Sequence, residues 1–414
     1  MAEKKPNIRF KGFEEEWEDK PFADAYKSAA EGGTPSTSVK DYYVGGSIPF
    51  VKIEDTEQKY IHDTASHITE KGMNNSSAWL IPSDSIIFTN GATIGNVAIN
   101  KVPVTTKQGI LGVIQDTSKF DLEYLYYALL TDEFQTEVEK RQSKGTFATI
   151  ILRNLDKIDI PHTSLPEQRK IGEFFKQLDE LIGAKEQELE KLRQIKLALL
   201  DKMFPSDNQE NINGGGKSLI YKMLQNNSQL VVSSPAPNTP TIRFRGFTEP
   251  WVKKKLCSII ELNGGIDYKK LSPGNIPVYG TGGYMLSVNK ALSYEKDAIG
   301  IGRKGTIDKP FILHAPFWTV DTLFYAIPRE RQDLNFCFCL FQIVDWEKHD
   351  ESTGVPSLSK SVINSIEVLV SSNYDEQCKI GDFFRSQDEA IANSRLQINK
   401  LKTIKQACLS QMFA

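Results

Sequence analysis

The sequence contains few cysteines, and they show no pattern of a known kind of site. The five cysteines all lie in the second half of the 414 residues and form no C-x-x-C pair. An odd number without that spacing indicates neither a disulfide framework nor a structural zinc site. The five histidines are scattered, with no H-E-x-x-H or similar spacing, so a catalytic metal or a His-based triad is not indicated either. The sequence predicts a reduced protein without a metal of its own.

Long hydrophobic runs and an excess of positive charge are also missing. No apolar run approaches the roughly 18 residues of a membrane span, and the opening MAEKKPNIRF lacks the apolar core of a signal peptide. We therefore expect a cytoplasmic protein with no membrane partner. The formal net charge is −3, whereas a protein that wraps nucleic acid unaided usually has a basic domain. A DNA reader with locally clustered basic residues, or one that shares phosphate contacts with partner subunits, is not excluded.

No complete catalytic motif is present. The sequence has neither an N-P-P-Y-like motif of adenine methylation nor a helicase loop. Glu57 and Lys59 could form half of a nuclease carboxylate–lysine pair, but they lie in a polar stretch without a clear upstream partner. A solvated strand edge is the better interpretation of these two residues. The sequence therefore predicts no catalytic residues, and recognition is the chemistry that remains.

What the sequence does contain is a long helical pattern that occurs twice. Residues 165–204 align without a gap with residues 374–413, at an offset of 209 as from Glu167 to Glu376. Apolar residues recur at alternating spacings of three and four, which is the seam of a coiled coil. About 40 residues at 1.5 Å each make a rod of roughly 60 Å. Two such stripes in two half-chains most simply pack on each other antiparallel.

Both predicted helices begin with the spacing of a capping box. Ser164 precedes Glu167 by three residues, and Asn373 precedes Glu376 by three. In this motif the two side chains satisfy backbone amides that the first turn leaves without partners. Matched starts are therefore predicted for the two helices.

The seams of both helices are interrupted at one equivalent point, by Lys196 and Lys405. A polar residue at such a position can fix the register of two helices at some cost in stability. The apolar positions that we expect to pack the helices are Ile171, Phe174, Phe175, Leu178, Ile182, Leu189, Leu192, Ile380, Phe383, Phe384, Ile391, Ile398 and Leu401.

The segments before the two helices are copies too. IRFKGFEEEW at residues 8–17 returns as IRFRGFTEPW at residues 242–251. Residues 81–99 predict a buried strand at 85–89, a tight Asn90–Gly91 turn and a second strand at 93–99. KDAIGIGRKGTIDKPFIL in the second half repeats this stretch. Each half is thus a globular unit followed by a long helix.

The predicted fold is α+β, with two β-rich mixed domains separated by two long antiparallel helices that form an internal repeat. A segment rich in Asn, Ser, Gly and Pro divides the halves and is absent from the repeat, as a linker would be. The predicted boundaries are 1–164 for the first domain, 165–204 for the central helix, 205–240 for the linker, 241–372 for the second domain and 373–414 for the distal helix.

Loops rich in Asn, Gln, Thr, Lys and Arg are the candidate recognition sites, because these side chains can hydrogen-bond base edges and phosphates. For any one of them an ordinary surface residue is the simpler interpretation, and the loops matter as a group. The candidates are Lys52, Asn90, Thr106, Lys107, Gln108, Lys144 and Thr146 in the first unit and Lys269, Lys270, Arg303, Lys304, Lys348, Ser352 and Thr353 in the second.

These features together resemble the specificity subunits of type I restriction-modification enzymes. LPEQRKIGEFF at residues 165–175, its echo DEQCKIGDFF at 375–384, the two R-F-x-G-F openings and the closing K-M-F and Q-M-F carry the resemblance. It covers essentially the whole chain. The second copy departs from the pattern, since Asp375 replaces the proline.

The resemblance implies two target recognition domains, each reading one half of a split, asymmetric DNA sequence, and a subunit without catalysis of its own. Two methylation subunits that use S-adenosylmethionine to methylate adenine N6 would dock on the helices, through the apolar positions named above. Two restriction subunits driven by ATP, with Mg²⁺, would join for translocation and cleavage, and this chain would bind none of these cofactors. Reading centres inside the ends of a roughly 60 Å rod would place the half-sites about 10 bp apart.

Two alternatives to this interpretation are open. A coiled-coil scaffold could use the globular units to bind proteins or glycans, and it would confer no sequence-selective methylation. A stand-alone nuclease built on Glu57 and Lys59 would cleave DNA with magnesium and lose that activity in Lys59→Ala.

Overall fold

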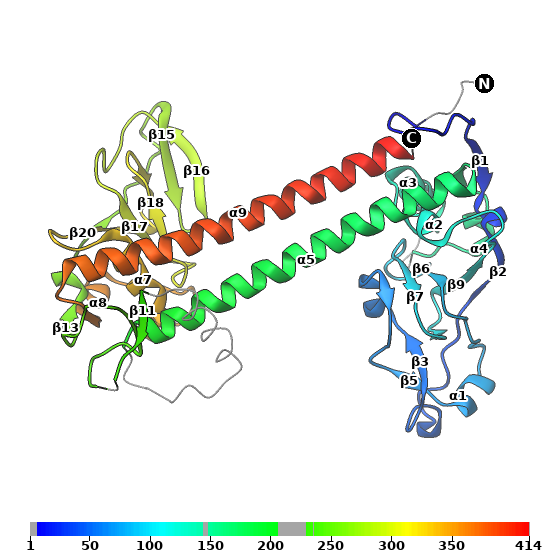
Figure 1. Cartoon of the computed structure of the whole chain (residues 1–414), viewed down its shortest axis with the longest axis horizontal. Helices are drawn as coiled ribbons and strands as arrows, with labels where there is room; N and C mark the ends of the chain where they lie inside the picture. Colours follow the sequence, from blue (N-terminus) through cyan, green and yellow to red (C-terminus); the bar gives the residue numbers. More distant parts are fainter. Residues whose placement is uncertain (1–5, 144–147, 206–228, 235, 414) are drawn as a thin grey trace. The chain divides into compact units, whose positions relative to one another are not determined.

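The computed structural model describes residues 6–143, 148–205, 229–234 and 236–413. The chain divides into two compact units, unit 1 with residues 1–185 and 397–414 and unit 2 with residues 186–396. Two long helices, α5 (Leu165–Met203) and α9 (Tyr374–Met412), each contribute to both units (Figure 1). Each unit therefore combines a globular domain, the first half of one long helix and the end of the other.

The globular part of unit 1 is built on a five-stranded sheet with the strand order β2-β9-β6-β7-β4. A three-stranded sheet, β5-β3-β8, and a two-stranded pair, β1-β10, accompany it. The strands are β1 (Glu18–Pro21), β2 (Tyr26–Glu31), β3 (Ile48–Val51), β4 (Tyr60–Ile61), β5 (His67–Ile68), β6 (Ser85–Thr89), β7 (Val97–Asn100), β8 (Thr105–Thr106), β9 (Ile110–Gln115) and β10 (Asp159–His162). The helices of this part are η1 (Phe22–Ala25), η2 (Lys40–Tyr42), η3 (Ile53–Glu57), α1 (Glu70–Asn74), α2 (Leu122–Ala128), α3 (Asp132–Arg141) and α4 (Leu152–Leu155).

Strand β6 shows why this sheet needs a nearly continuous apolar sequence. All five of its residues are buried. Ile86 and Phe88 belong to the core that also holds α2, whereas Ile87 belongs to a second core on the other face. A strand covered on both faces cannot alternate with polar residues. The predicted strand at 85–89 is confirmed.

The predicted Asn-Gly hairpin after this strand is wrong. β7 begins at Val97 and not at residue 93. The N–H groups of Asn90 and Gly91 both donate to the carbonyl of Gly109, at 3.0 and 3.1 Å. Because of this backbone pairing, the chain continues in the direction of β6 past Asn90. It reverses only near Gly95, which has a φ of +98°.

Unit 2 has a four-stranded sheet with the order β14-β20-β17-β18 and a three-stranded sheet with the order β16-β15-β19. Two strand pairs, β13-β21 and β11-β12, complete it. The strands are β11 (Leu230–Val232), β12 (Ile242–Phe244), β13 (Val252–Lys255), β14 (Ile260–Gly264), β15 (Pro273–Gly280), β16 (Gly283–Val288), β17 (Ala298–Gly302), β18 (Phe311–Leu313), β19 (Trp318–Thr319), β20 (Leu323–Pro328) and β21 (Glu367–Val370). The helices are η4 (Leu256–Ser258), α7 (Leu334–Ile343), η5 (Trp346–His349) and α8 (Lys360–Ser365).

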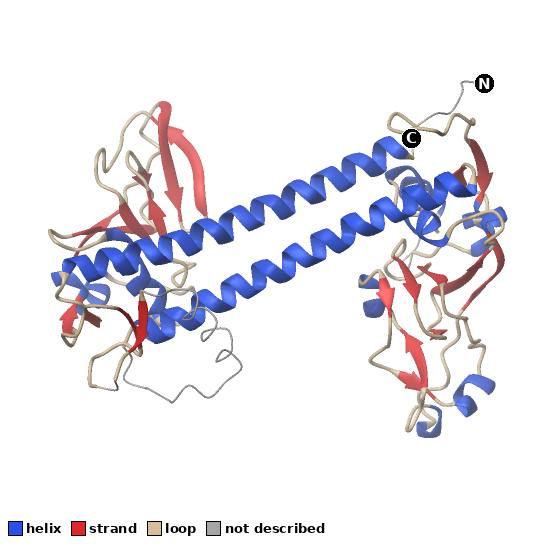
Figure 2. Ribbon diagram, viewed as in Figure 1, coloured by secondary structure: helices blue, strands red, loops and turns tan. Residues whose placement is uncertain are grey.

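The two units repeat one topology, so the predicted α+β fold with an internal repeat is confirmed. In unit 1, β9 lies between β2 and β6, and β3 pairs parallel with β8. In unit 2, β20 lies between β14 and β17, and β15 pairs parallel with β19. Figure 2 shows the strands in red within these globular parts and the two long helices in blue.

Most of the segment predicted as a linker, residues 206–228 and 235, lies outside the described residues. Part of what remains is ordered into a strand. β11 pairs antiparallel with β12, the opening strand of the second repeat. The domain boundaries given from the sequence stay a prediction.

A buried charge cluster joins the opening of the first repeat to the start of α5. Glu167 is fully buried, and its carboxylate accepts hydrogen bonds from Arg9 Nε at 2.6 Å and Nη2 at 2.8 Å. Trp17 Nε1 donates to the same carboxylate at 3.1 Å, and Thr163 Oγ1 donates to it as well. The charged form of a buried carboxylate is stable only when it is paired and hydrogen-bonded in this way.

The second repeat builds the same cluster. Glu376 accepts from Arg243 Nε at 2.5 Å and Nη2 at 3.0 Å, from Trp251 Nε1 at 3.2 Å and from Ser371 Oγ at 2.5 Å. The prediction that Glu167 and Glu376 complete capping boxes is therefore wrong, because both carboxylates bind an arginine and a tryptophan. Asn373 does cap α9, since its Oδ1 accepts from the Glu376 N–H at 3.3 Å.

The glutamine and the glycine that follow each glutamate seat a second helix. The Oε1 of Gln168 accepts from the Asp121 N–H at 2.9 Å, at the start of α2. A Cβ added to Gly172 would lie 2.8 Å from the Tyr124 backbone nitrogen, which is too close for any side chain. A Cβ added to Gly381 would likewise lie 2.9 Å from the Phe336 backbone nitrogen of α7. The sequence signature is thus largely a packing motif.

In unit 1 the end of α9 runs antiparallel to the start of α5. Phe413 lies 6.0 Å from Phe175, ring to ring, and Lys405 Nζ lies 2.6 Å from Asp179 Oδ1. Residue numbers therefore fall along α9 as they rise along α5. Phe413 and Met412 are part of the core of unit 1.

Unit 2 contains the equivalent arrangement. Phe204 lies 6.2 Å from Phe384, and Lys196 Nζ lies 2.6 Å from Asp388 Oδ1. Phe204 and Met203 belong to the core of this unit. Each lysine that interrupts a seam therefore pairs with one aspartate of the other helix, which supports the predicted role in register.

Among the described residues, no helix is long and apolar enough to cross a membrane.

We predict that Glu376→Ala lowers the free energy of unfolding of unit 2 by about 3–5 kcal/mol. The substitution leaves the guanidinium of Arg243, which is 3% exposed, without its carboxylate in a buried site. Urea unfolding followed by tryptophan fluorescence measures the loss. Glu367→Ala is the matched control, because its pair with Lys253 is about half exposed on both sides and is worth at most about 1 kcal/mol. Equal losses in the two variants would contradict the prediction.

Candidate functional site

In unit 1 the structure brings several predicted loop residues to one place. The Lys107 N–H donates to the Val51 carbonyl at 3.0 Å, so residues 107–109 lie beside the end of β3 and Lys52. The Ile150 N–H donates to the Asn90 carbonyl at 2.9 Å, which adds residues 148–150. We call residues 52, 90–91, 107–109 and 148–150 loop cluster 1.

The members of loop cluster 1 differ in exposure. Lys107 and Gln108 are exposed, and Lys52 is half-buried. Thr106, next to the cluster, is fully buried, and its Oγ1 donates to the Ile110 carbonyl at 3.1 Å. Asn90 is 5% exposed, and its Nδ2 donates to the Ile150 carbonyl at 3.2 Å. These two side chains hold the loops together and face the protein. Lys144 and Thr146 lie outside the described residues.

Unit 2 forms the corresponding cluster around Arg303. Its N–H donates to the Thr322 carbonyl at 2.8 Å, and its carbonyl accepts from the Leu358 N–H at 2.9 Å. The Gly305 N–H donates to the Pro356 carbonyl at 2.8 Å. We call residues 303–305, 320–322 and 351–358 loop cluster 2. Arg303 and Lys304 stand where Asn90 and Gly91 stand in unit 1.

Loop cluster 2 borders a pocket with an excess of positive charge. The pocket has a volume of about 570 Å³. Arg303, Lys304 and Lys360 line it, with Glu351 as the acidic member. The three basic side chains are exposed, and the guanidinium of Arg303 lies 5.8 Å from the centre of the Phe324 ring. A site of this kind favours an anion such as a phosphate.

The other predicted residues of unit 2 lie in different surroundings. Ser352 is in loop cluster 2, where its N–H donates to Asp350 Oδ1 at 2.9 Å, and Thr353 is exposed beside it. Lys269 and Lys270 are exposed on the loop between β14 and β15.

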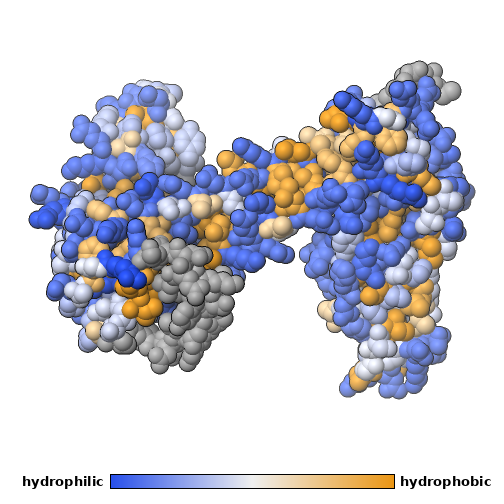
Figure 3. All heavy atoms as spheres, in the orientation of Figure 1, coloured by the Kyte–Doolittle hydropathy of each residue, from blue (hydrophilic) through white to orange (hydrophobic). Residues whose placement is uncertain are grey.

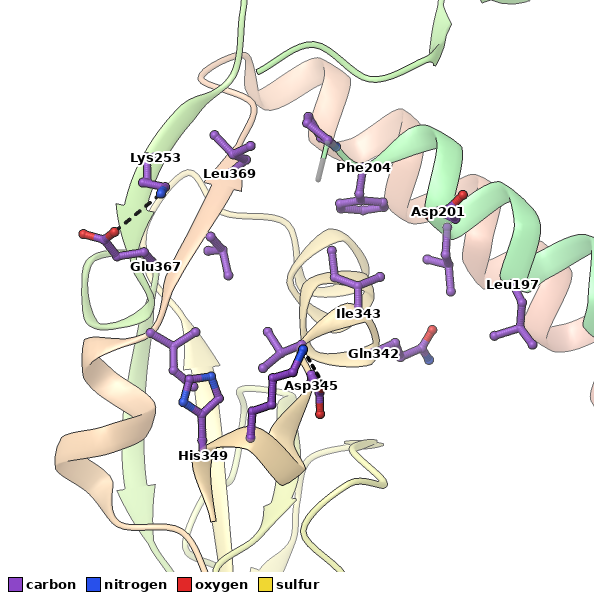
Figure 4. Close-up of a pocket in the computed structure, with 16 residues that line it drawn as sticks. Leu197, Asp201, Phe204, Lys253, Gln342, Ile343, Asp345, His349, Glu367 and Leu369 are labelled. Carbon is purple, nitrogen blue, oxygen red and sulfur yellow. Dashed lines mark ion pairs between the residues drawn. The ribbon is translucent and has the colours of Figure 1, made fainter. Parts of the chain in front are cut away.

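Lys348 lies at a separate cavity of about 640 Å³, which the end of α5 also lines. There its Nζ pairs with Asp345 Oδ2 at 3.0 Å, one of the two ion pairs drawn as dashed lines in Figure 4. The structure therefore does not bring Lys348 to the Arg303 pocket.

Neither the nuclease interpretation nor the preferred one, a solvated strand edge, fits Lys59, because its side chain is 13% exposed and paired within the protein. Lys59 Nζ pairs with Glu123 at 2.8 Å and donates to Tyr127 OH at 2.6 Å, and that hydroxyl donates to Asp179 of α5 at 2.7 Å. Burial lowers the pKa of Lys59, and the hydrogen bond to Glu123 partly offsets this effect. Lys59 thus joins the sheet of unit 1 to its helices. In the described part of the chain, no group of three or more His, Cys, Asp or Glu residues is placed to hold a metal ion.

The predicted packing positions of the helices are buried or half-buried. The buried ones are Ile171, Phe175, Ile182, Leu189, Ile380, Phe384, Ile391 and Ile398, and the half-buried ones are Phe174, Leu178, Leu192, Phe383 and Leu401. Four apolar residues that sequence reasoning missed are exposed instead, by 46–66%: Leu181, Leu197, Leu396 and Ile404. Figure 3 shows hydrophobic atoms in orange on the surface of the helices. The seam pattern could not reveal these residues, because they lie off it.

The comparison with known proteins decides the family. The family model described as the type I restriction modification DNA specificity domain matches residues 14–194 and 248–403. The chain belongs to this family. It is 27% identical over 417 residues to the type I restriction enzyme MjaIX specificity subunit of Methanocaldococcus jannaschii, covering 96% of this chain and 92% of the relative.

Two further comparisons agree. The HindI specificity subunit of Haemophilus influenzae is 34% identical over 147 residues, which is 35% of this chain and 31% of that relative. The solved S subunit of M. genitalium shares the fold, with a TM-score of 0.65 and 17% identity over 99% of both chains. The chain is thus a type I specificity subunit, a non-catalytic DNA-recognition subunit that acts in a complex with other subunits and DNA.

We predict that Lys107→Ala weakens DNA binding by this specificity subunit, whereas Thr106→Ser, which keeps the buried hydroxyl bonded to the Ile110 carbonyl, leaves it unchanged. Lys107 is exposed on loop cluster 1, while Thr106 is fully buried. A lost phosphate contact reduces the dependence of log affinity on log salt by about one unit, and titrations at several salt concentrations measure this slope. Equal slopes for Lys107→Ala and the unsubstituted chain would contradict the prediction.

Proposed function

We propose that each unit of this specificity subunit reads one half of a split, asymmetric DNA sequence, and that the subunit thereby directs methylation of adenine N6. The proposal rests on one observation: the two units share the same scaffold but carry different loop clusters. Loop cluster 2 exposes Arg303 and Lys304 where unit 1 has the buried Asn90 and Gly91, and loop cluster 1 exposes Lys107 and Gln108 instead. Side chains with different donors and acceptors select different bases, so two unlike half-sites follow from two unlike clusters.

The exposed loop residues are the proposed DNA contacts. In unit 1 these are Lys107 and Gln108 together with the half-buried Lys52, and in unit 2 Arg303, Lys304 and Thr353 together with the half-buried Ser352. Lysine and arginine would hold phosphates, and Gln108 could read a base edge. Lys269 and Lys270 remain candidates on a neighbouring loop, and Lys144 and Thr146 belong to the proposal by sequence alone. Thr106, Asn90 and Lys348 receive no DNA-contacting role, because of the burial and positions described above.

The chemistry of methylation and cleavage belongs to partner subunits in this proposal. Two methylation subunits would carry S-adenosylmethionine, and two restriction subunits would use ATP and Mg²⁺. Extrusion of the target adenine from the duplex would be the work of the methylation subunits. The specificity subunit would place these partner subunits at the target sequence on the DNA.

The outward-facing apolar residues of the helices are the proposed docking points for the methylation subunits. Leu197 is 66% exposed and Ile404 51% exposed, although such residues on a helix usually face a core. Phe175, in contrast, is fully buried in the core of unit 1. A charge introduced at Phe175 would unfold that core and would not test docking.

We predict that Leu197→Asp weakens the association of the methylation subunit with this chain by about tenfold or more, because a buried carboxylate without a partner is costly. Co-purification and titration of the two subunits measure the effect. Gln187→Asp, at an exposed polar position of the same helix, is the matched control. Normal association of the Leu197→Asp variant would remove this residue from the docking surface.

The test of the proposed function is a map of N6-methyladenine on genomic DNA. Cells that carry the chain with its methylation subunit are compared with cells in which the chain is deleted. We expect a split motif that disappears on deletion. Unchanged methylation with the chain expressed would contradict the proposal.

A domain exchange tests whether the units read independently. Replacing residues 20–163 by the equivalent region of another specificity subunit should change one half of the motif and leave the other half as it was. This result is expected because the residues of loop cluster 1 all lie within the exchanged segment. A change in both halves would contradict independent reading.

A further inference from the structure

The tip of the β15–β16 hairpin in unit 2 carries two exposed apolar side chains. β15 and β16 pair antiparallel up to Gly280 and Gly283, so only Thr281 and Gly282 form the turn. Tyr284 is 63% exposed and Met285 49% exposed, directly after it. The register shifts between the pairs Val278–Leu286 and Tyr279–Tyr284, so Met285 is an extra residue of β16 at a bulge. The tip therefore presents two consecutive exposed apolar side chains.

Contacts within the protein hold the tip in place. The Tyr284 ring packs edge-on against Tyr279 at 6.3 Å between centroids, and its hydroxyl lies 3.2 Å from Ser287 Oγ. A Cβ added to Gly280 would lie 2.8 Å from Met285 Sδ, so the thioether lies across this glycine. The exposed side chains are therefore positioned before any partner arrives, which lowers the entropic cost of binding.

The tip lies next to the basic loop cluster 2. The Val320 N–H, in that cluster, donates to the Tyr279 carbonyl at 3.0 Å. A Cβ added to Gly305 would lie 3.9 Å from Thr281 Oγ1. The hairpin tip and the Arg303 pocket are therefore parts of one surface, apolar at the hairpin and positively charged beside it.

Unit 1 has a counterpart of this strand pair but not of its tight turn, because β3 pairs antiparallel with β5 as β15 does with β16. β3 corresponds to β15, because each pairs parallel with a short strand, β8 or β19. After β3 the chain enters η3 at once, and the Lys52 N–H donates to Asp55 Oδ2 at 2.8 Å. The two-residue turn with Tyr284 and Met285 beside it is thus a feature of unit 2, since η3 and β4 lie between β3 and β5 in unit 1. An element that reads one particular half-site would differ between the units in this way.

We propose that the β15–β16 hairpin enters the major groove of duplex DNA, with Tyr284 and Met285 in contact with base edges and Arg303 and Lys304 on the flanking phosphates. The major groove admits a two-stranded β-ribbon and exposes the thymine methyl group, which apolar side chains contact. The inference rests on the proposed function and adds to it two residues that determine specificity in one half-site.

The test uses the full chain with its methylation subunits and a library of duplexes with randomised sequence. The double variant Tyr284→Ala/Met285→Ala is compared with Tyr294→Ala, which removes another tyrosine of unit 2 that is also 63% exposed. We expect the double variant to lose about tenfold in preference at neighbouring positions of one half-site, the range of a base contact. The other half-site and the Tyr294→Ala variant should keep their preferences.

The possible outcomes separate this inference from the proposed function. If the unsubstituted chain selects no sequence, the proposed function fails. If it does select one and the double variant matches Tyr294→Ala, only the hairpin inference is overturned. An equal loss of affinity for all sequences also overturns it, because the hairpin would then contact the DNA backbone alone.

Modified duplexes test the groove without any substitution in the protein. Uracil in place of thymine removes the C5 methyl group, and 7-deazapurines remove N7, both of which face the major groove. At the positions affected by the double variant, these changes should weaken binding of the unsubstituted chain. Unchanged binding would overturn the assignment to the major groove.

Discussion

The buried pairing of a glutamate with an arginine, a tryptophan and a hydroxyl is the interaction on which each repeat depends. Glu167 and Glu376 sit in the first turn of the long helices, and each binds residues from the opening of its own repeat. A buried carboxylate without these partners would be unstable. The pairing therefore fixes where each helix leaves its globular domain. The glutamine and the glycine that follow each glutamate then hold the start of α2 or α7 against the first part of the long helix.

This arrangement explains how the scaffold that both units share can support two different reading surfaces. The residues that define the repeat are committed to buried contacts, so they can recur in both halves. In the loops that follow β6 and β17, equivalent backbone hydrogen bonds place Asn90 and Arg303, and Asn90 adds a side-chain bond, from Nδ2 to the Ile150 carbonyl. Their side chains are free to differ, and so are the elements after β3 and β15. Function on this fold resides in loops placed by a rigid frame.

Some expectations failed where tertiary contacts overrode a local signal. The Asn90–Gly91 pair predicts a two-residue hairpin, but both N–H groups bond to Gly109, which is distant in the sequence. Thr106 and Asn90 are the residue types that read DNA, yet both are buried and hydrogen-bonded within the protein. The sequence favours a solvated strand edge for Lys59, but its side chain is 13% exposed and lies among Glu123, Tyr127 and Asp179. Local patterns cannot reveal partners that come from other elements.

The sequence by itself determined the repeat, the two long helices and the family. These features are encoded by periodicity and by motifs whose residues lie close together in the chain, so no folding information is needed to find them. The tertiary structure decided which polar loop residues are exposed, that the signature glutamates bind arginine and tryptophan, and that the Tyr284 tip adjoins the basic pocket. Each of these depends on residues far apart in the sequence, such as Arg9 and Glu167, whose contact exists only once the chain has folded.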